Sequence, residues 1–453
     1  MRRREEVLKK RIWMIIAAVA VGLQAGRIIV AQGVGDLPHL RGYPNVSGLV
    51  RTYSTAGHLD RQNPFFQSLG TNGRACATCH DPANGWSVSA EAIESRFRLS
   101  RGADPIFRTN DSSDCPGQST YTLLRSRGLI RVSLPIPEEA EFALQSVADP
   151  FGCNSQPSDI GMYRRPLPSA NLAFVTTLMW DGRETLPGQT LEEGLAHQSV
   201  SATLGHAEAL SAPTVAQQAA IVAFQRALFV AQAEDHSAGR LNAGNADGGP
   251  ESLAFQPFYP GINDPVGLNP TGTPFSPIVF TLFRDWASSP DLWKRLIAVG
   301  ERIFNTRQFV IANVPGLNDR FLDGAPLTTG TCTICHDTPN VGNHSVPAPL
   351  DIGVADPQRA PFLPVYRFAC NSGPMAGTLI STTDPGRAMI SGRCADIGKF
   401  KGPVLRALAS RAPYFHNGSA RTLSEVVQFY ESRFTIGLTP LERVALVAFL
   451  SAL

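Results

Sequence analysis

Cys76-Ala-Thr-Cys79-His80 and Cys332-Thr-Ile-Cys335-His336 are the two stretches that decide how this 453-residue chain folds. Residues three apart share one face of a helical turn, so each cysteine pair presents both sulfurs on the same side. A histidine follows directly. This pattern is typical of c-type haem attachment, in which two thioether bonds hold the porphyrin and the histidine binds iron. Composition predicts about 0.003 such motifs by chance, whereas this chain contains two.

A zinc site and a thioredoxin-like redox pair are the alternative interpretations of these cysteines. Structural zinc sites normally draw on cysteine pairs that are close in sequence, and these two pairs are far apart. A thioredoxin-like pair requires a βαβ context, which the sequence lacks. We therefore predict two covalently bound c-type haems. The predicted haem-binding residues are Cys76, Cys79, His80, Cys332, Cys335 and His336, with His80 and His336 as iron ligands.

The first residues of the chain have the pattern of an export signal. Six arginines and lysines among residues 2–11 precede an apolar run over residues 12–23, followed by small residues. We predict a signal peptide over residues 1–31, cleaved after Ala25 or Ala31, and a periplasmic protein. An uncleaved membrane anchor is the alternative, although the apolar run is shorter than the roughly 20 residues that span a bilayer. No other segment could span one.

Four further cysteines remain for disulfides, which persist outside the cytoplasm. The sequence order favours Cys115 with Cys153 and Cys370 with Cys394, although four cysteines allow three connectivities and all four could be free thiols. The formal net charge of +2 gives no reason to expect nucleic-acid binding.

The fold class predicted from the sequence is mainly α, because strand-like alternation is scarce. We expect an N-terminal haem domain over residues 45–289 and a C-terminal haem domain over residues 290–453. Loop-rich insertions are expected at residues 101–168 and 238–278, which are rich in small and polar residues and proline. Helices are predicted over residues 215–232, 291–303, 422–431 and 440–453 from apolar spacing and capping residues.

Four segments of the chain resemble the bacterial di-haem cytochrome c peroxidase and MauG family. The segments are residues 72–80 (NGRACATCH), Trp180-Asp-Gly-Arg183, the second haem motif with residues 337–342, and residues 400–406 running into 412–419 (APYFHNGS). The resemblance covers about residues 55 to 453. It implies two cytochrome c-like domains, in which the N-terminal haem reacts with hydrogen peroxide and the C-terminal haem relays electrons.

The resemblance also implies roles for single residues. Trp180 matches the tryptophan that the family places between its haems, and a core tryptophan is the alternative reading. His416 matches a histidine with a positioning role near the propionates or between the haems. Tyr430 matches the sixth iron ligand of the C-terminal haem, which is methionine in the peroxidases and tyrosine in MauG. Met375 and Met389 are the alternative ligands.

The peroxide-binding side departs from the family pattern. Residues 81–110 contain no histidine, so we expect the iron at His80 to keep an open position. Peroxide cleavage needs a group that takes and returns a proton, and His206 is the first candidate and Glu208 the second. Either could instead be a surface residue. The resemblance also implies a possible inter-domain calcium ion, held by carbonyls near Arg411 and Pro413.

Together these features predict a periplasmic oxidoreductase of the peroxidase type. Its partners would be hydrogen peroxide and a small electron donor, either a cytochrome c or a cupredoxin. The alternatives are a MauG-like enzyme that uses peroxide to oxidise another substrate, a di-haem electron carrier without catalytic turnover, and a non-catalytic haem-binding module of a larger complex.

Overall fold

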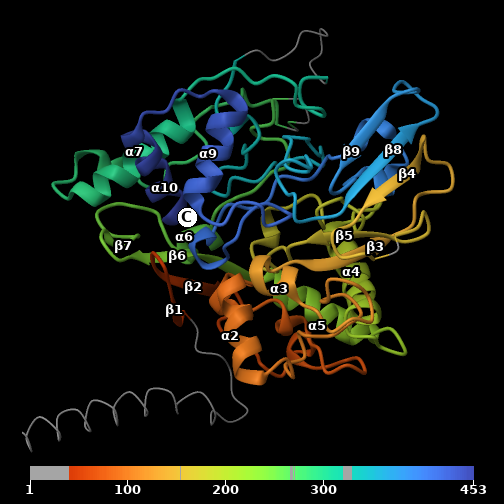
Figure 1. Cartoon of the computed structure of the whole chain (residues 1–453). Helices are drawn as coiled ribbons and strands as arrows, with labels where there is room; N and C mark the ends of the chain where they lie inside the picture. The colour runs from red at the N-terminus through yellow and green to blue at the C-terminus, as the bar shows by residue number, and fades with distance from the viewer. Residues whose placement is uncertain (1–39, 154, 266–268, 270, 320–328) are drawn as a thin grey trace, which may run out of the picture.

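The computed structural model describes residues 40–153, 155–265, 269, 271–319 and 329–453, and the predicted signal at residues 1–31 lies outside them. Figure 1 shows the path of the chain. The helices are α2 (Ala90–Ser100), α3 (Thr122–Arg127), α4 (Leu191–Gly205), α5 (Val215–Arg226), α6 (Pro250–Ala254), α7 (Leu292–Thr306), α8 (Ala388–Ser391), α9 (Leu423–Phe434) and α10 (Pro440–Ser451).

The strands form three antiparallel sheets, with the orders β1-β2-β6-β7, β3-β5 and β4-β8-β9. Their bounds are β1 (Gly42–Asn45), β2 (Gly48–Ser54), β3 (Ile130–Leu134), β4 (Phe142–Ala148), β5 (Ile160–Arg164), β6 (Leu228–Asp235), β7 (Gly239–Arg240), β8 (Val365–Cys370) and β9 (Leu379–Thr382). With this much strand among the described residues, the prediction of a mainly α class is not confirmed.

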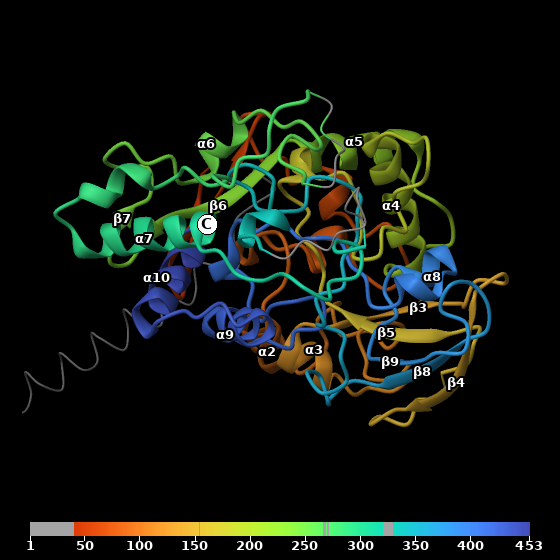
Figure 2. The same cartoon turned by 90° about the horizontal axis from the view of Figure 1, so that it is seen from above.

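The sheet β4-β8-β9 contains strands from both halves of the chain. Phe142 of β4 lies opposite Cys370 of β8, and Figure 2 shows these strands together on one side of the molecule. β3, β4 and β5 fall in the stretch 101–168, which was expected to be a loop-rich insertion. β3 pairs with the nearby β5, whereas β4 pairs with β8 more than 200 positions later, so local sequence gives little sign of β4.

The helix predicted over residues 215–232 is too long. α5 ends at Arg226, and Leu228 and Phe229 begin the buried strand β6, which pairs with β2. The apolar pattern of α5 continues into β6 because β6 is buried along most of its length and is therefore also apolar. A short apolar run reads the same in a helix as in a buried strand.

The helices predicted near the C-terminal haem motif are confirmed. Asp291 caps α7, and Thr439 and Glu442 form a capping box at the start of α10. α7 and α10 cross closely at Gly300, where a Cβ atom would lie 2.0 Å from the carbonyl oxygen of Ala445. Only glycine permits this approach. Thr422 caps α9, which carries Tyr430.

Both expected disulfides are present. Cys115 is bonded to Cys153 and Cys370 to Cys394, with Cα–Cα distances of 5.5 and 6.0 Å. The second bond lies beside the sheet that joins the two halves. The four cysteines of the haem motifs form no disulfide.

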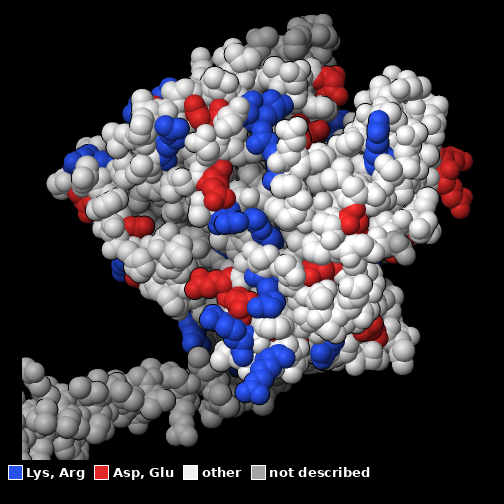
Figure 3. Space-filling model, viewed as in Figure 1, with Lys and Arg blue, Asp and Glu red and all other residues white. Residues whose placement is uncertain are grey.

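The described residues contain no helix that is both long enough and apolar enough to cross a membrane. On the face seen in Figure 3, basic and acidic side chains are interspersed, and neither sign forms a continuous patch. This mixed surface agrees with the formal net charge of +2.

Candidate functional site

The first cysteine pair lies on a single turn of 3₁₀ helix, Cys76–Thr78. The amides of Cys79 and His80 both donate to the Cys76 carbonyl, at 3.2 and 3.1 Å, which sets both thiols on the same turn. His80 Nδ1 donates to the carbonyl oxygen of Trp86 at 3.0 Å. Because this fixes the proton on Nδ1, the Nε2 lone pair is available to a metal, the usual arrangement for a metal-binding histidine.

The second pair repeats this geometry on the turn Cys332–Ile334. The His336 amide donates to the Cys332 carbonyl at 3.2 Å, and His336 Nδ1 donates to the Gly342 carbonyl at 2.6 Å. Burial lowers the pKa of His336 to about 4, so the ring is neutral and able to bind a metal at neutral pH. The donor set at both motifs therefore fits a c-type haem.

A large cavity opens beside the first pair, with about 1580 Å³ of empty volume that includes space open to solvent. Cys76, Cys79 and His80 line it, together with Trp180 and His206. Much of the remaining lining is apolar, including Leu69, Leu167, Leu178, Leu195, Ile221 and Val404. Cofactor sites are commonly apolar clefts with few polar groups, and the lining of this cavity has that composition.

Two cationic side chains at the cavity have no acidic partner in the described part of the chain. Arg165 donates only to carbonyl oxygens, those of Arg127, Val88 and Arg411. Burial lowers the pKa of Arg165 to about 9 and that of Lys401 to about 8, and the positive charge of Arg411 adds to both effects. Buried cations are normally paired with an anion. The propionate carboxylates of a haem would supply that charge.

His206 caps the C-terminal end of α4 and lines the same cavity. Its Nδ1 is hydrogen bonded to Asp111 Oδ2, while Arg74 Nη1 donates to the other carboxylate oxygen at 2.5 Å. Burial favours the neutral form of Asp111, but the hydrogen bonds and charges of His206 and Arg74 outweigh it and lower the pKa. Asp111 is therefore an ionised carboxylate that binds the His206 imidazole through Nδ1. The Nε2 atom of His206 remains available to a molecule in the cavity.

Glu208 is not brought to the cavity. Its side chain is exposed and accepts a hydrogen bond from Asn72 Nδ2 at 3.0 Å. The backbone turns away after His206, since Glu208 has a positive φ of 51° and its carbonyl accepts from Thr71. Of the two candidate proton-transfer groups, the geometry favours His206.

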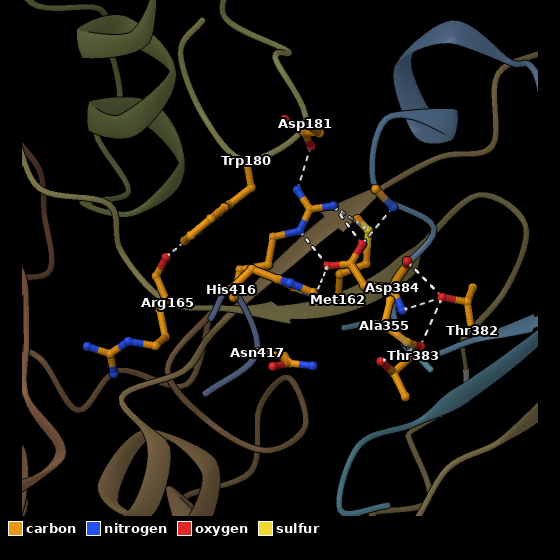
Figure 4. A network of polar contacts seen from close by, with 12 residues as sticks. Met162, Arg165, Trp180, Asp181, Ala355, Thr382, Thr383, Asp384, His416 and Asn417 are labelled. Atoms are coloured by element: carbon orange, nitrogen blue, oxygen red, sulfur yellow. Dashed lines mark hydrogen bonds and ion pairs between the residues drawn. The ribbon is translucent and has the colours of Figure 1, made fainter. Parts of the chain in front are cut away.

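Trp180 lines the cavity, and Figure 4 shows its ring close to that of His416. Their ring centroids are 6.0 Å apart, and Trp180 Nε1 donates to the Arg165 carbonyl at 2.8 Å. His416 stacks on Phe400 at 3.9 Å. Burial lowers the pKa of His416 to about 4, so it is a neutral ring.

Arg164 fixes the surroundings of His416 by pairing with Asp181 and Asp384, and all three side chains are buried. Asp384 Oδ2 lies 3.9 Å from His416 Nε2. Asp181 directly follows Trp180 in the chain, so this network links the Trp-Asp-Gly-Arg segment to the segment that carries His416.

Tyr430 faces the second motif from α9. The Tyr430 and His336 ring centroids are 6.4 Å apart at an angle of 73°, and Phe434 stacks on Tyr430. Burial raises the pKa of the Tyr430 hydroxyl. Met375 and Met389, the alternative ligands, pack in a different cluster beside β8 and β9.

The carbonyl of Arg411, expected near a calcium ion, accepts a hydrogen bond from Arg165 Nη2 at 2.7 Å.

The structure adds residues that the sequence did not reveal. Asp111 lies in a loop-rich stretch with no motif, and Arg165 directly follows β5, also outside any motif. Lys401 belongs to the matched segment 400–406, which is the one signal that could have found it.

Curated relatives of this chain are cytochrome-c peroxidases. The chain is 37% identical over 181 residues to cytochrome-c peroxidase IdrP2 of Denitromonas iodatirespirans, which covers 34% of this chain and 47% of the relative. It is 37% identical over 134 residues to IdrP2 of Pseudomonas sp. (strain SCT), with 27% and 35% covered. The match therefore spans about half or less of each relative.

No family model matches the chain. A crystal structure of a MauG-like protein associated with microbial copper homeostasis aligns with 93% of this chain and 95% of its own, at 16% identity and a TM-score of 0.39. The sequence matches confirm the resemblance found in the motifs: this chain is a relative of the bacterial cytochrome-c peroxidases.

Proposed function

We propose that this chain is an exported cytochrome c peroxidase that reduces hydrogen peroxide in the cavity beside His80, with electrons relayed through a second haem at His336. The observation that carries the proposal is the shared cavity, because a haem-attachment motif and the Asp111-held His206 line the same space. A c-type haem bound there would supply the iron redox chemistry. The chain's own side chains supply proton transfer, charge balance and an electron path.

His206 is the proton-transfer group in this proposal. Reduction of one peroxide to two waters consumes two electrons and two protons, and one oxygen must leave as water. His206 Nε2 would accept a proton from bound peroxide and return it to the departing oxygen. Asp111 supports this role because it holds the Nδ1 tautomer and stabilises the imidazolium that forms.

Trp180 and His416 are the proposed electron path from the second haem. Trp180 lines the cavity, and its ring lies 6.0 Å from His416. Phe400 stacks on the other side of His416. Contacting aromatic rings give a continuous path out of the cavity. The donor would be a small cytochrome c or cupredoxin, encountered in the periplasm.

His197 gives a matched control for His206. His197 lies in α4 and His206 caps its C-terminal end. Both pair with a carboxylate through Nδ1, and their side chains are 54% and 45% exposed, but of the two only His206 lines the cavity. In stopped-flow reactions with peroxide and reduced cytochrome c, we expect His206→Gln to lower kcat/KM about 10²–10⁴-fold. His197→Gln should leave it unchanged. Equal rates in all three proteins would refute the role of His206.

A spectrum of the ferric protein separates the peroxidase from an electron carrier. An open iron position predicts a high-spin haem band and cyanide binding. A fully low-spin spectrum that does not respond to cyanide would favour the carrier and contradict the proposal.

Tyr430 supports a second candidate, a MauG-like enzyme that uses peroxide to oxidise another substrate. If Tyr430 were a ligand of the second haem, its phenolate would stabilise ferric and higher oxidation states more than methionine does. A long-lived oxidised species that does not react with reduced cytochrome c in the same stopped-flow experiment would favour this function over the peroxidase.

A further inference from the structure

A buried cluster of two carboxylates and one imidazole lies away from the cavity. Asp264, Asp337 and His344 each offer one ligand atom, and these atoms lie within 4.8 Å of one another. Their residues are 6%, 0% and 5% exposed. Asp337 directly follows the predicted iron ligand His336, but its carboxylate joins a different group of side chains. Neither the haem sites nor the proposed proton transfer uses this cluster.

His344 is oriented as a metal-binding histidine. Its Nδ1 donates to the Ala348 carbonyl at 3.0 Å, so the open lone pair is on Nε2. His344 Nε2 is buried without a hydrogen-bond partner, and its nearest acidic atom, Asp264 Oδ1, is 3.7 Å away. That separation is too long for a hydrogen bond. Leaving such an atom unsatisfied costs about 1–3 kcal/mol.

The same distance fits two ligands of one ion. Two ligands that each lie ~2.1 Å from a tetrahedral cation are about 3.4 Å apart. Asp337 keeps ligand capacity as well, since each of its oxygens accepts one hydrogen bond from Ser345, at 2.8 Å, and has a second lone pair. These bonds also hold the carboxylate in place, as second-shell contacts do for metal ligands.

We propose that Asp264, Asp337 and His344 bind one divalent cation of the zinc type. One imidazole and two carboxylates suit Zn²⁺, which takes nitrogen and oxygen ligands in four-coordinate sites. Calcium requires six to eight oxygens, and this group offers too few. The site is distinct from the calcium expected near Arg411 and Pro413.

The cation would fasten the loop at residues 261–264 to the second haem segment. Gly261 already donates to Ser345 Oγ, the same hydroxyl that donates to Asp337. The ion would add a direct link from Asp264 to both Asp337 and His344. Its role is structural, and it is independent of the proposed peroxidase activity.

Zinc content of the secreted di-haem protein tests the proposal. After chelator treatment, incubation with Zn²⁺ and desalting, elemental analysis should find two irons and one zinc per chain, with excess Ca²⁺ making no difference. His344→Gln and Asp264→Asn should lose the zinc and keep both irons, whereas His236→Gln, at an exposed histidine, should keep both metals. A wild-type protein with two irons and no zinc would overturn the site, as would displacement of the zinc by calcium.

X-ray absorption at the zinc edge needs only the wild-type protein and remains informative if the variants do not fold. The proposal predicts nitrogen and oxygen neighbours at about 2.0–2.2 Å. A sulfur shell at about 2.3 Å would place the zinc on a cysteine pair without haem and overturn the assignment.

Discussion

The two haem-attachment motifs have the same local geometry but different surroundings. At Cys76–His80 the histidine lines a cavity with a polar couple, His206 and Asp111, and with two cations. At Cys332–His336 aromatic rings pack around the histidine, with Phe304 at 5.8 Å and Tyr430 at 6.4 Å. In the proposed di-haem protein, the shared turn would hold each haem in the same way, and the surroundings would decide the chemistry of each haem.

In the proposed function, this difference separates a site that admits and protonates a small substrate from one that exchanges electrons. Peroxide chemistry needs room and a proton-transfer group, and only the first of these two regions has His206. Electron transfer favours a buried redox cofactor with fixed ligands, because the surrounding atoms then move little when the charge of the cofactor changes. The predictions below test this division of roles, beginning with the largest expected effect.

Removing one attachment pair at a time should separate the two roles completely. The double variant Cys76→Ser/Cys79→Ser should lose the mass of one haem and all reaction with peroxide. Cys332→Ser/Cys335→Ser should also lose one haem but still react with peroxide in a single turnover, because His80 and His206 remain. Mass spectrometry and stopped-flow absorbance check both. Peroxide reaction in the first variant would break the comparison.

Asp111→Asn should lower kcat/KM about 10–100-fold, as loss of an orienting partner does. The carboxylate has a lowered pKa, so in the wild type its support is present above the ordinary pKa of an aspartate and is lost as pH falls through the folded value. The acid limb of the pH–rate profile should therefore change in Asp111→Asn. Glu184→Gln, which removes the partner of His197, is the control. An identical profile in both variants would remove Asp111 from the mechanism.

His416 should make the protein sensitive to acid. Its pKa is about 4 in the folded state, below the ordinary value of about 6.5, because burial disfavours the charged ring. Below about pH 6.5 the unfolded chain binds a proton at this histidine that the folded chain does not bind. The free energy of unfolding therefore decreases as the pH is lowered below about 6.5, and this histidine does not change it above that pH. Between pH 7.5 and pH 5 the free energy of unfolding should fall by about 2 kcal/mol. Denaturant unfolding of His416→Gln should lack that part of the loss.

Tyr430→Phe should have the smallest effect on the peroxide reaction, which we expect to stay within about twofold, because Tyr430 faces the other motif. The haem spectrum of this variant should change if the Tyr430 phenol is an iron ligand of the second haem. Tyr414→Phe removes a buried hydroxyl from the same core, one that donates to the Leu408 carbonyl at 3.1 Å, and should leave the haem bands unchanged. Identical spectra for wild type and Tyr430→Phe would exclude tyrosine ligation.

The sequence predicted the parts of the site that depend on short spacing. The haem motifs, both disulfide pairings and the capped helices α7, α9 and α10 all follow from residues that are near one another or few in number. The contact between Asp111 and His206 could not be predicted, because it joins a loop to the end of a helix 95 positions later. Sheet content was underestimated for the same reason, since β4 and β6 find their partners across long stretches of chain.

The sheet shared by the two halves has a consequence for how the chain is made. Tyr366 of β8 donates to the carbonyl of Gly161 in β5, 205 positions earlier, and β4 pairs with β8 across a similar interval. During synthesis the edge of β4 therefore stays unpaired until β8 has been made. Unpaired strand edges tend to form incorrect pairs and to aggregate. Non-local pairing of this kind also slows folding. The two halves therefore cannot fold one after the other, because β8 of the C-terminal half completes a sheet that begins with β4 of the N-terminal half.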